Sequence, residues 1–147
     1  MLDAELPLDA HAEALVFAAS RAQAMAEIVE PALARGETIV ADRFVHSSLV
    51  YQGAVRGLGV EAVRAINEFA THGRRPDLVV LLDVCLADAR ARGATDTADR
   101  FEGESDAFVE RVLAAYREVC AGALVLDGHD DPALIADRIW TAVNGHR

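Results

Sequence analysis

The residues best suited to chemistry lie in a short stretch that begins at Asp42. Asp42 and Arg43 follow the apolar run 39–41 directly and offer a carboxylate beside a guanidinium. Open α/β sheets bind their ligands beyond the carboxyl ends of their strands, so this pair stands where such a protein keeps its chemistry. The next segment reads as a helix that could aim further polar groups at one pocket: Ser47, Ser48, Tyr51 and Gln52. In a plainer interpretation, Asp42 caps that helix and Arg43 makes a surface ion pair.

A second candidate pair lies upstream, on a long segment with helical spacing. Phe17 and Arg21 are four residues apart and therefore share one helical face. A flat apolar ring beside a hydrogen-bond donor suits a nucleobase. The alternative is that Phe17 belongs to the core and Arg21 is a solvated charge.

The third candidate region is the polar, glycine-flanked segment 93–103, which has no periodicity. Loops of this kind between packed elements are often active-site lids. Arg90, Arg92 and Arg100 lie in or beside it and could close on a phosphate. An ordinary solvated surface loop would have the same composition.

Composition limits the partners of the chain. With 147 residues we expect one domain, and a net charge of −10 argues against a nucleic-acid surface. A small phosphorylated ligand remains compatible, because a few local arginines can hold it. All 14 basic residues are arginine, which suits bidentate phosphate binding but equally reflects GC-rich coding.

Apolar runs and cysteines indicate a cytoplasmic protein without a membrane partner. Apolar runs such as 78–82 are too short to cross a bilayer, and the first residues do not resemble a signal peptide. Cys85 and Cys120 show no metal-ligand spacing, so we expect reduced, buried thiols and no metal.

The elements that must position these residues alternate between helices and strands. This order predicts an α/β fold with a parallel sheet and right-handed crossovers. On the first helix we expect an inward stripe that includes Leu15, Ala18, Ala19 and Ala26; we also expect Phe69 to face inward and Trp140 to cap the core. The expected helices are 9–35, 46–56, 60–72, 86–92, 105–121 and 131–143, and the expected strands are 38–41, 78–84 and 124–128.

Four segments together resemble the thymidylate kinase (dTMP kinase) family of the bacterial type. The matches run from about Leu15 to Tyr116 in the order and at the spacing of that family. The resemblance implies a three-layer α/β/α fold with a parallel sheet, like that of P-loop nucleoside-monophosphate kinases. It places an acceptor-nucleotide site at about 13–57 and a lid at about 90–104 within a single domain, 1–147. The four segments are EALVFAASRAQ at 13–23, DRF with SS and YQG at 42–53, RRPDL at 74–78 and DRFE at 99–102.

The resemblance also implies residue roles in transferring a phosphoryl group from ATP to dTMP. Phe17 would stack on thymine, Arg21 would donate to a thymine carbonyl, and Ser48 would read the ring N–H with Ser47 beside it. Tyr51 would lie against the sugar, and Gln52 would support the base side. Arg43 would hold the 5′-phosphate and Asp42 would orient it or a magnesium-bound water. The expected catalytic residues are Asp42, Arg43, Arg92 and Arg100, and the expected lid residues are Arg90, Arg92, Arg100 and Glu102.

One departure from the family pattern concerns ATP. The family begins with a strand and a GxxxxGK[ST] phosphate loop, whereas this sequence has no such motif and no lysine. We therefore expect an N-terminally truncated domain that lacks the main loop for ATP and Mg²⁺ and is inactive alone. Three hypotheses stay open: the dTMP-binding and lid portion of a thymidylate kinase, a non-catalytic nucleotide-binding or dimerisation module derived from that family, and a related kinase with another acceptor base. The family also implies a homodimer.

Overall fold

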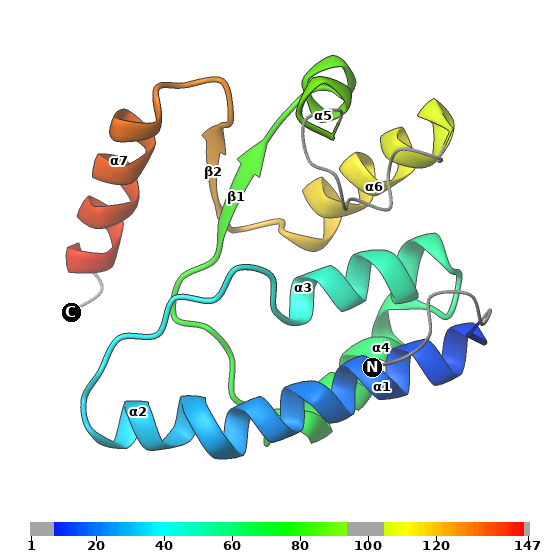
Figure 1. Ribbon diagram of the computed structural model, residues 1–147, viewed down its shortest axis with the longest axis vertical. Helices are drawn as coiled ribbons and strands as arrows, with labels where there is room; N and C mark the ends of the chain where they lie inside the picture. Colours follow the sequence, from blue (N-terminus) through cyan, green and yellow to red (C-terminus); the bar gives the residue numbers. More distant parts are fainter. Residues whose placement is uncertain (1–7, 94–104, 146–147) are drawn as a thin grey trace. The chain divides into compact units, whose positions relative to one another are not determined.

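The structure is a computed structural model that describes residues 8–93 and 105–145. The chain divides after Arg75 into two compact units, Met1–Arg75 and Pro76–Arg147. Figure 1 shows the helices of the first unit in blue to green and the strands and helices of the second in green to red. The single domain that the sequence predicts stays a prediction.

The first unit begins with the long helix that the sequence predicts. It comprises α1 (Ala10–Ala24), a π-helical segment (Met25–Val29) and α2 (Glu30–Ala34). Asp9 is its N-cap and accepts hydrogen bonds from the backbone N–H groups of His11 and Ala12, and Gly36 follows its end with a φ of 76°. The π-helical turns come directly before Pro31, whose missing N–H removes one bond of the regular α-helical ladder.

The buried face of this helix differs from the predicted stripe by one position. Ala14, Ala18, Met25 and Ala32 are buried, and Ala18 is the only one of these that we predicted. Leu15 is 56% exposed, and Ala19 and Ala26 are exposed too. An alanine-rich helix carries two neighbouring apolar stripes, so the pattern alone does not determine which one packs inward.

Two shorter helical segments pack against the long helix. The first comprises α3 (Val45–Ser48) and a π-helical continuation (Leu49–Val55), and the second is α4 (Val60–Ala70). Gly57 and Gly59 separate them with φ values of 79° and 88°, as the predicted helix break requires.

The buried side of α4 confirms only part of its predicted pattern. Val63 and Ala70, whose helical spacing also predicts an inward position, are buried, and the polar Asn67 lies between them with 1% exposure. Phe69 is 86% exposed, so its predicted inward orientation is wrong. Phe69 lies next to the helix end at Thr71 and points away from the stripe that Val63, Asn67 and Ala70 form at spacings of four and three.

The strand expected at 38–41 is not a strand in the structure. Residues 37–41 have no regular secondary structure, and Val40 is 91% exposed. The described part of the first unit holds no strand with which this segment could form a sheet.

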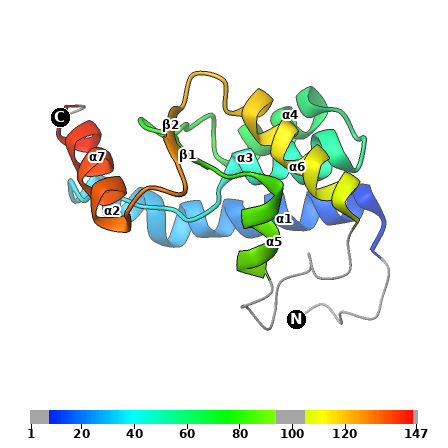
Figure 2. The ribbon, with the colours of Figure 1, turned by 90° about the horizontal axis from the view of Figure 1, so that it is seen from above.

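The second unit confirms the predicted parallel sheet and α/β class. Strands β1 (Val80–Asp83) and β2 (Leu124–Asp127) pair in parallel, with Val80 opposite Leu124 and Asp83 opposite Asp127. Figure 2 shows the two strands side by side. The connection between them contains α5 (Leu86–Gly93) and α6 (Asp106–Val119), and α7 (Pro132–Gly145) follows β2.

The helix ends of this unit agree with the sequence, but only part of its predicted burial is confirmed. Ser105 caps α6 through its side chain, and Gly122 follows that helix with a φ of 96°. Two expectations are wrong, because Trp140 is 61% exposed on α7 and Cys85 is exposed, whereas Cys120 is buried as predicted. Helix α7 has no buried residue. None of the described helices is long and apolar enough to cross a membrane.

Candidate functional site

Arg21 is the centre of a polar cluster inside the first unit. From α1 its guanidinium donates to the side-chain oxygen of Asn67, to the backbone carbonyl of Phe44 at 3.1 Å and to the Ser48 hydroxyl at 3.2 Å. The guanidinium also lies 5.2 Å from the centre of the Phe44 ring, within cation–π range. Burial lowers the pKa of this arginine from its ordinary value, although the charge persists at neutral pH. Arg21 is therefore held in one orientation by α4 and by α3 with its N-cap residue.

Asn67 is one of the residues that hold the guanidinium of Arg21 in place. It lies on α4 and is itself anchored, because its amide donates to the carbonyl of Val63 at 2.8 Å. An amide used in this way presents its oxygen toward Arg21, so the two side chains satisfy each other in a buried place.

A second set of hydrogen bonds joins α1 to the π-helical segment Leu49–Val55. Gln52 donates to a carboxylate oxygen of Glu13 at 2.6 Å, and Arg56 donates to the other oxygen at 3.4 Å. Gln52 is 4% exposed, so its amide belongs to the packed interface and not to open solvent.

Phe17 lies between these two sets of hydrogen bonds on α1. Glu13, Phe17 and Arg21 recur every four residues, so they line one face of the helix. Because Glu13 contacts Gln52 and Arg21 contacts Ser48, that face is turned toward the segment that carries both partners. Phe17 is 47% exposed, so its ring is accessible to a ligand. The alternative interpretation, in which Phe17 belongs to the core, is therefore wrong.

The predicted carboxylate–guanidinium pair, Asp42 and Arg43, lies in the loop before α3. Asp42 and Arg43 are both exposed, and Arg43 has a φ of 62°. A left-handed backbone at a non-glycine residue is uncommon and is found more often at functional sites. The plainer interpretation finds no support, since α3 has Phe44 at its N-cap without a side-chain cap, and Arg43 forms no ion pair with another described residue.

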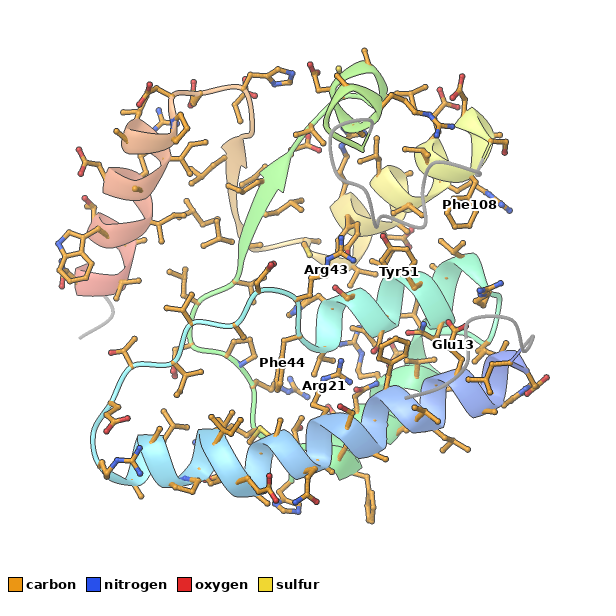
Figure 3. All side chains as sticks on the ribbon, viewed as in Figure 1. Glu13, Arg21, Arg43, Phe44, Tyr51 and Phe108 are labelled. Carbon is orange, nitrogen blue, oxygen red and sulfur yellow. The ribbon has the colours of Figure 1, made fainter. Side chains whose placement is uncertain are left out.

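Figure 3 shows how these side chains are arranged within the first unit. Arg21 and Phe44 lie between α1 and α3, whereas Arg43 and Tyr51 project from the side of that helical segment opposite α1. Tyr51 is half-buried, as is Ser47, and Ser48 is buried. The structure thus brings Phe17, Arg21, Ser48 and Gln52 to one interface and leaves Asp42 and Arg43 on the adjoining loop.

The predicted lid residues belong to the second unit. Arg90 on α5 forms an ion pair with Asp106 at the start of α6, at 2.9 Å. Arg92 lies within α5, but its side chain is outside the described part. Arg100 and Glu102 lie outside the described residues altogether, as does most of the predicted lid.

Two members of the cluster, Asn67 and Glu13, had no predicted role. Asn67 gave a signal in the sequence, because it is a polar residue on the apolar stripe of an amphipathic helix. Glu13 gave one as well, since it precedes Phe17 by four residues. Neither signal names a partner, and only the packing of three helices shows what each side chain contacts.

A helical unit with an arginine-centred polar cluster, followed by a unit with a parallel sheet, defines an α/β protein. A sequence model described as "Thymidylate kinase" matches residues 1–139. A protein named thymidylate kinase from Desulforudis audaxviator is 46% identical over 135 residues, which cover 89% of this chain and 61% of that protein. Proteins of the same name from Finegoldia magna and Rhodopseudomonas palustris are 46% and 37% identical, over 81% and 91% of this chain. The chain belongs to the thymidylate kinase family.

The matches cover only part of each relative. The chain spans 60% of the Finegoldia magna protein and 62% of the Rhodopseudomonas palustris protein. The activity of those whole proteins therefore comes to this chain as a proposal.

Proposed function

We propose that the chain forms the acceptor-nucleotide and lid portion of a thymidylate kinase, which transfers a phosphoryl group from ATP to dTMP. The observation that supports this most is the fixed guanidinium of Arg21 beside the exposed ring of Phe17 and the hydroxyl of Ser48. A planar base needs a stacking surface and fixed polar groups at its edge, and these residues offer both.

Arg21 is the base-reading residue in this proposal. A guanidinium has five N–H donors, and three of them are used in the bonds to Asn67, Phe44 and Ser48. Among the described residues the other two N–H groups have no hydrogen-bond acceptor, so they are available to a carbonyl of thymine. Cytosine carries an amino group where thymine carries its 4-carbonyl, so a donor at this place favours thymine.

We infer the roles of the other residues of the acceptor-nucleotide site from their positions around Arg21. Phe17 stacks on the base, Ser48 with Ser47 reads its ring N–H, and Gln52 supports the base side through its bond to Glu13. Tyr51 on the π-helical segment and Arg43 in the loop before α3 project to the same side, which suits the sugar and the 5′-phosphate. Asp42 orients that phosphate.

The lid residues carry the charge that phosphoryl transfer requires. Transfer depends mostly on positioning and on charge stabilisation, so guanidinium groups suit it. In the proposal Arg90, Arg92 and Arg100 approach the transferring group, and Arg90 first exchanges its partner Asp106 for phosphate. Glu102 belongs to the same segment.

ATP and Mg²⁺, which the family uses, find no matching site among these residues. The sequence contains no lysine and no GxxxxGK[ST] motif. Strand β1 leads into α5 through Val84 and Cys85, not through a glycine-rich turn. Steps that involve ATP therefore lie outside what the residues of this chain explain.

A homodimer is part of the proposal, as is a cytoplasmic location. Leu15, Ala19 and Ala26 form a stripe on the long helix that stays exposed in the described structure. Small residues allow a second helix to approach closely, so this stripe suits an isologous contact with a second copy.

A non-catalytic nucleotide-binding or dimerisation module of the same family is the second candidate. The exposed stripe supports this candidate equally well, because it needs no chemistry. The DNA upstream of Met1 separates the two. An in-frame GxxxxGK[ST] favours the kinase, and its absence favours the module.

The proposed base reading is tested by replacing Arg21 with alanine. We expect R21A to weaken dTMP binding about tenfold or more, since a hydrogen bond from a charged donor contributes about 1.5–3 kcal/mol. Deoxycytidine monophosphate should lose much less. Calorimetric titration of both nucleotides measures this, with the surface variant R35A as the matched arginine control. Equal losses for both nucleotides would show that Arg21 does not read the base.

A further inference from the structure

A cluster of three metal-ligand types lies in the second unit, apart from the arginine-centred site. Cys85, Asp88 and His129 each offer one ligand atom, and the three atoms lie within 4.8 Å of one another. The thiol of Cys85 donates to Asp88, and Nε2 of His129 contacts the same carboxylate oxygen. His129 is separated from Asp88 by 41 positions, so no sequence spacing indicates the cluster.

The parallel sheet explains why these side chains meet. Asp83 and Asp127 are opposite each other at the ends of β1 and β2, so the loops that follow leave the sheet at the same edge. The first loop carries Cys85 and the second carries His129. The backbone N–H of Gly128 donates to the carbonyl of Asp83 at 2.8 Å, which holds the two loops together. The loops that carry Cys85 and His129 are therefore joined by a backbone hydrogen bond.

Helix α5 places Cys85 next to Asp88. The carbonyl of Cys85 accepts the N–H of Ala89, so Cys85 lies at the N-terminal end of that helix, within one turn of Asp88.

His129 has the outer contact that is usual for a metal-binding imidazole. Its Nδ1 lies 2.6 Å from a carboxylate oxygen of Asp127, while Nε2 faces Asp88 and Cys85. Metal-ligating histidines nearly always donate their other ring N–H to such an acceptor, which fixes the tautomer and the ring orientation.

From this geometry we propose that Cys85, Asp88 and His129 bind one Zn²⁺-class cation, with Asp127 as the outer partner of the histidine. Thiolate and imidazole select borderline-soft metals such as Zn²⁺ over Mg²⁺. Metal–ligand bonds of about 2.0–2.3 Å in a tetrahedral site place ligand atoms roughly 3.3–3.8 Å apart. The three ligand atoms of the cluster lie within 4.8 Å of one another, which is close to this range. Three protein ligands leave the fourth position to water, and all three side chains are at least partly exposed, so the ion is exchangeable.

Cobalt absorption tests the proposal on the full chain without a histidine tag. Co²⁺ bound to a thiolate gives a charge-transfer band in the near ultraviolet, and added Zn²⁺ removes it. We expect one saturable equivalent per chain in the wild type and no such band in C85S. H129Q and D88N should bind Co²⁺ more weakly, and D127N should lose about 10–100-fold in affinity.

The buried Cys120 supplies the matched control. C120A should keep the wild-type band, because Cys120 lies at the end of α6 and outside the cluster. Circular dichroism of each variant confirms that it is folded. No saturable band in the wild type, or a band that survives in folded C85S, would overturn the proposal and leave the cluster as a hydrogen-bonded contact between two loops. Nucleotide binding does not enter this readout, so its outcome is independent of the proposed kinase function.

Discussion

At the scale of single residues, the main effect of the first unit is to fix the orientation of the Arg21 side chain. A free arginine side chain loses much rotamer entropy when it binds a ligand. Here the bonds to Asn67, Phe44 and Ser48 fix the guanidinium before a nucleotide arrives. The sequence showed that Arg21 and Phe17 share a face, and it could not show that Asn67 holds the arginine, because the two are 46 positions apart.

Replacing Asn67 with alanine tests the importance of this contact. N67A leaves the half-buried guanidinium of Arg21 without one of its acceptors and removes the bond to Val63. We expect the free energy of unfolding to fall by about 1–3 kcal/mol, as measured by urea denaturation. N144A, at an exposed position of α7, is the control and should change it little. A loss in N67A no larger than in the control would contradict the buried bracing of Arg21.

His46 makes the stability of the first unit depend on pH. Burial, with a smaller contribution from the charge of Arg64, lowers the pKa of this half-buried histidine below its usual value of about 6.5. The unfolded chain then binds the proton more readily than the folded one, so stability is complete above that value and decreases as the pH falls through it. We expect H46Q to lose less stability than the wild type between about pH 8 and pH 5.5.

Urea midpoints at the two pH values measure this difference. The exposed His72 provides the control, since H72Q should keep the wild-type pH dependence. If H46Q and the wild type lose stability in parallel, the buried imidazole is not the cause.

At the scale of elements, local signals located the helices better than the strands. Asp9, Gly36, Gly59 and Gly122 mark helix ends that the structure confirms, because a cap or a left-handed glycine acts within one turn. A strand depends on a neighbour from elsewhere in the chain. The segment 38–41 has the composition of a strand, but the described part of its unit offers no strand to pair with it, whereas β1 and β2 pair with each other.

The exposed stripe on the long helix leads to a prediction about assembly. A19E places a charge in the middle of the surface that also includes Leu15 and Ala26. If that surface joins two copies, the wild-type chain should sediment as a dimer and A19E as a monomer, because an unpaired buried charge is costly. Analytical ultracentrifugation measures both. A136E on α7 is the control and should remain dimeric, since Ala136 is exposed in the other unit. A monomeric wild type would exclude this contact.

At the scale of the whole molecule, the two units divide the proposed work. In the proposal the first recognises an acceptor nucleotide, and the second holds Arg90 and the cysteine–histidine cluster. The family resemblance predicted the α/β class and the family itself, which the family match over residues 1–139 confirms. The roles of the individual site residues stay predictions, because each depends on a ligand that only binding experiments can supply.

Nuclear magnetic resonance of the isotope-labelled chain titrated with dTMP tests the acceptor site most directly. We predict saturable shifts that are largest at the Arg21 side-chain N–H signals and at the backbone amides of Phe17 and Ser48, with much weaker effects from deoxycytidine monophosphate. Shifts confined to residues 76–147, or no saturable shift at Arg21, would contradict a thymidylate site in the first unit.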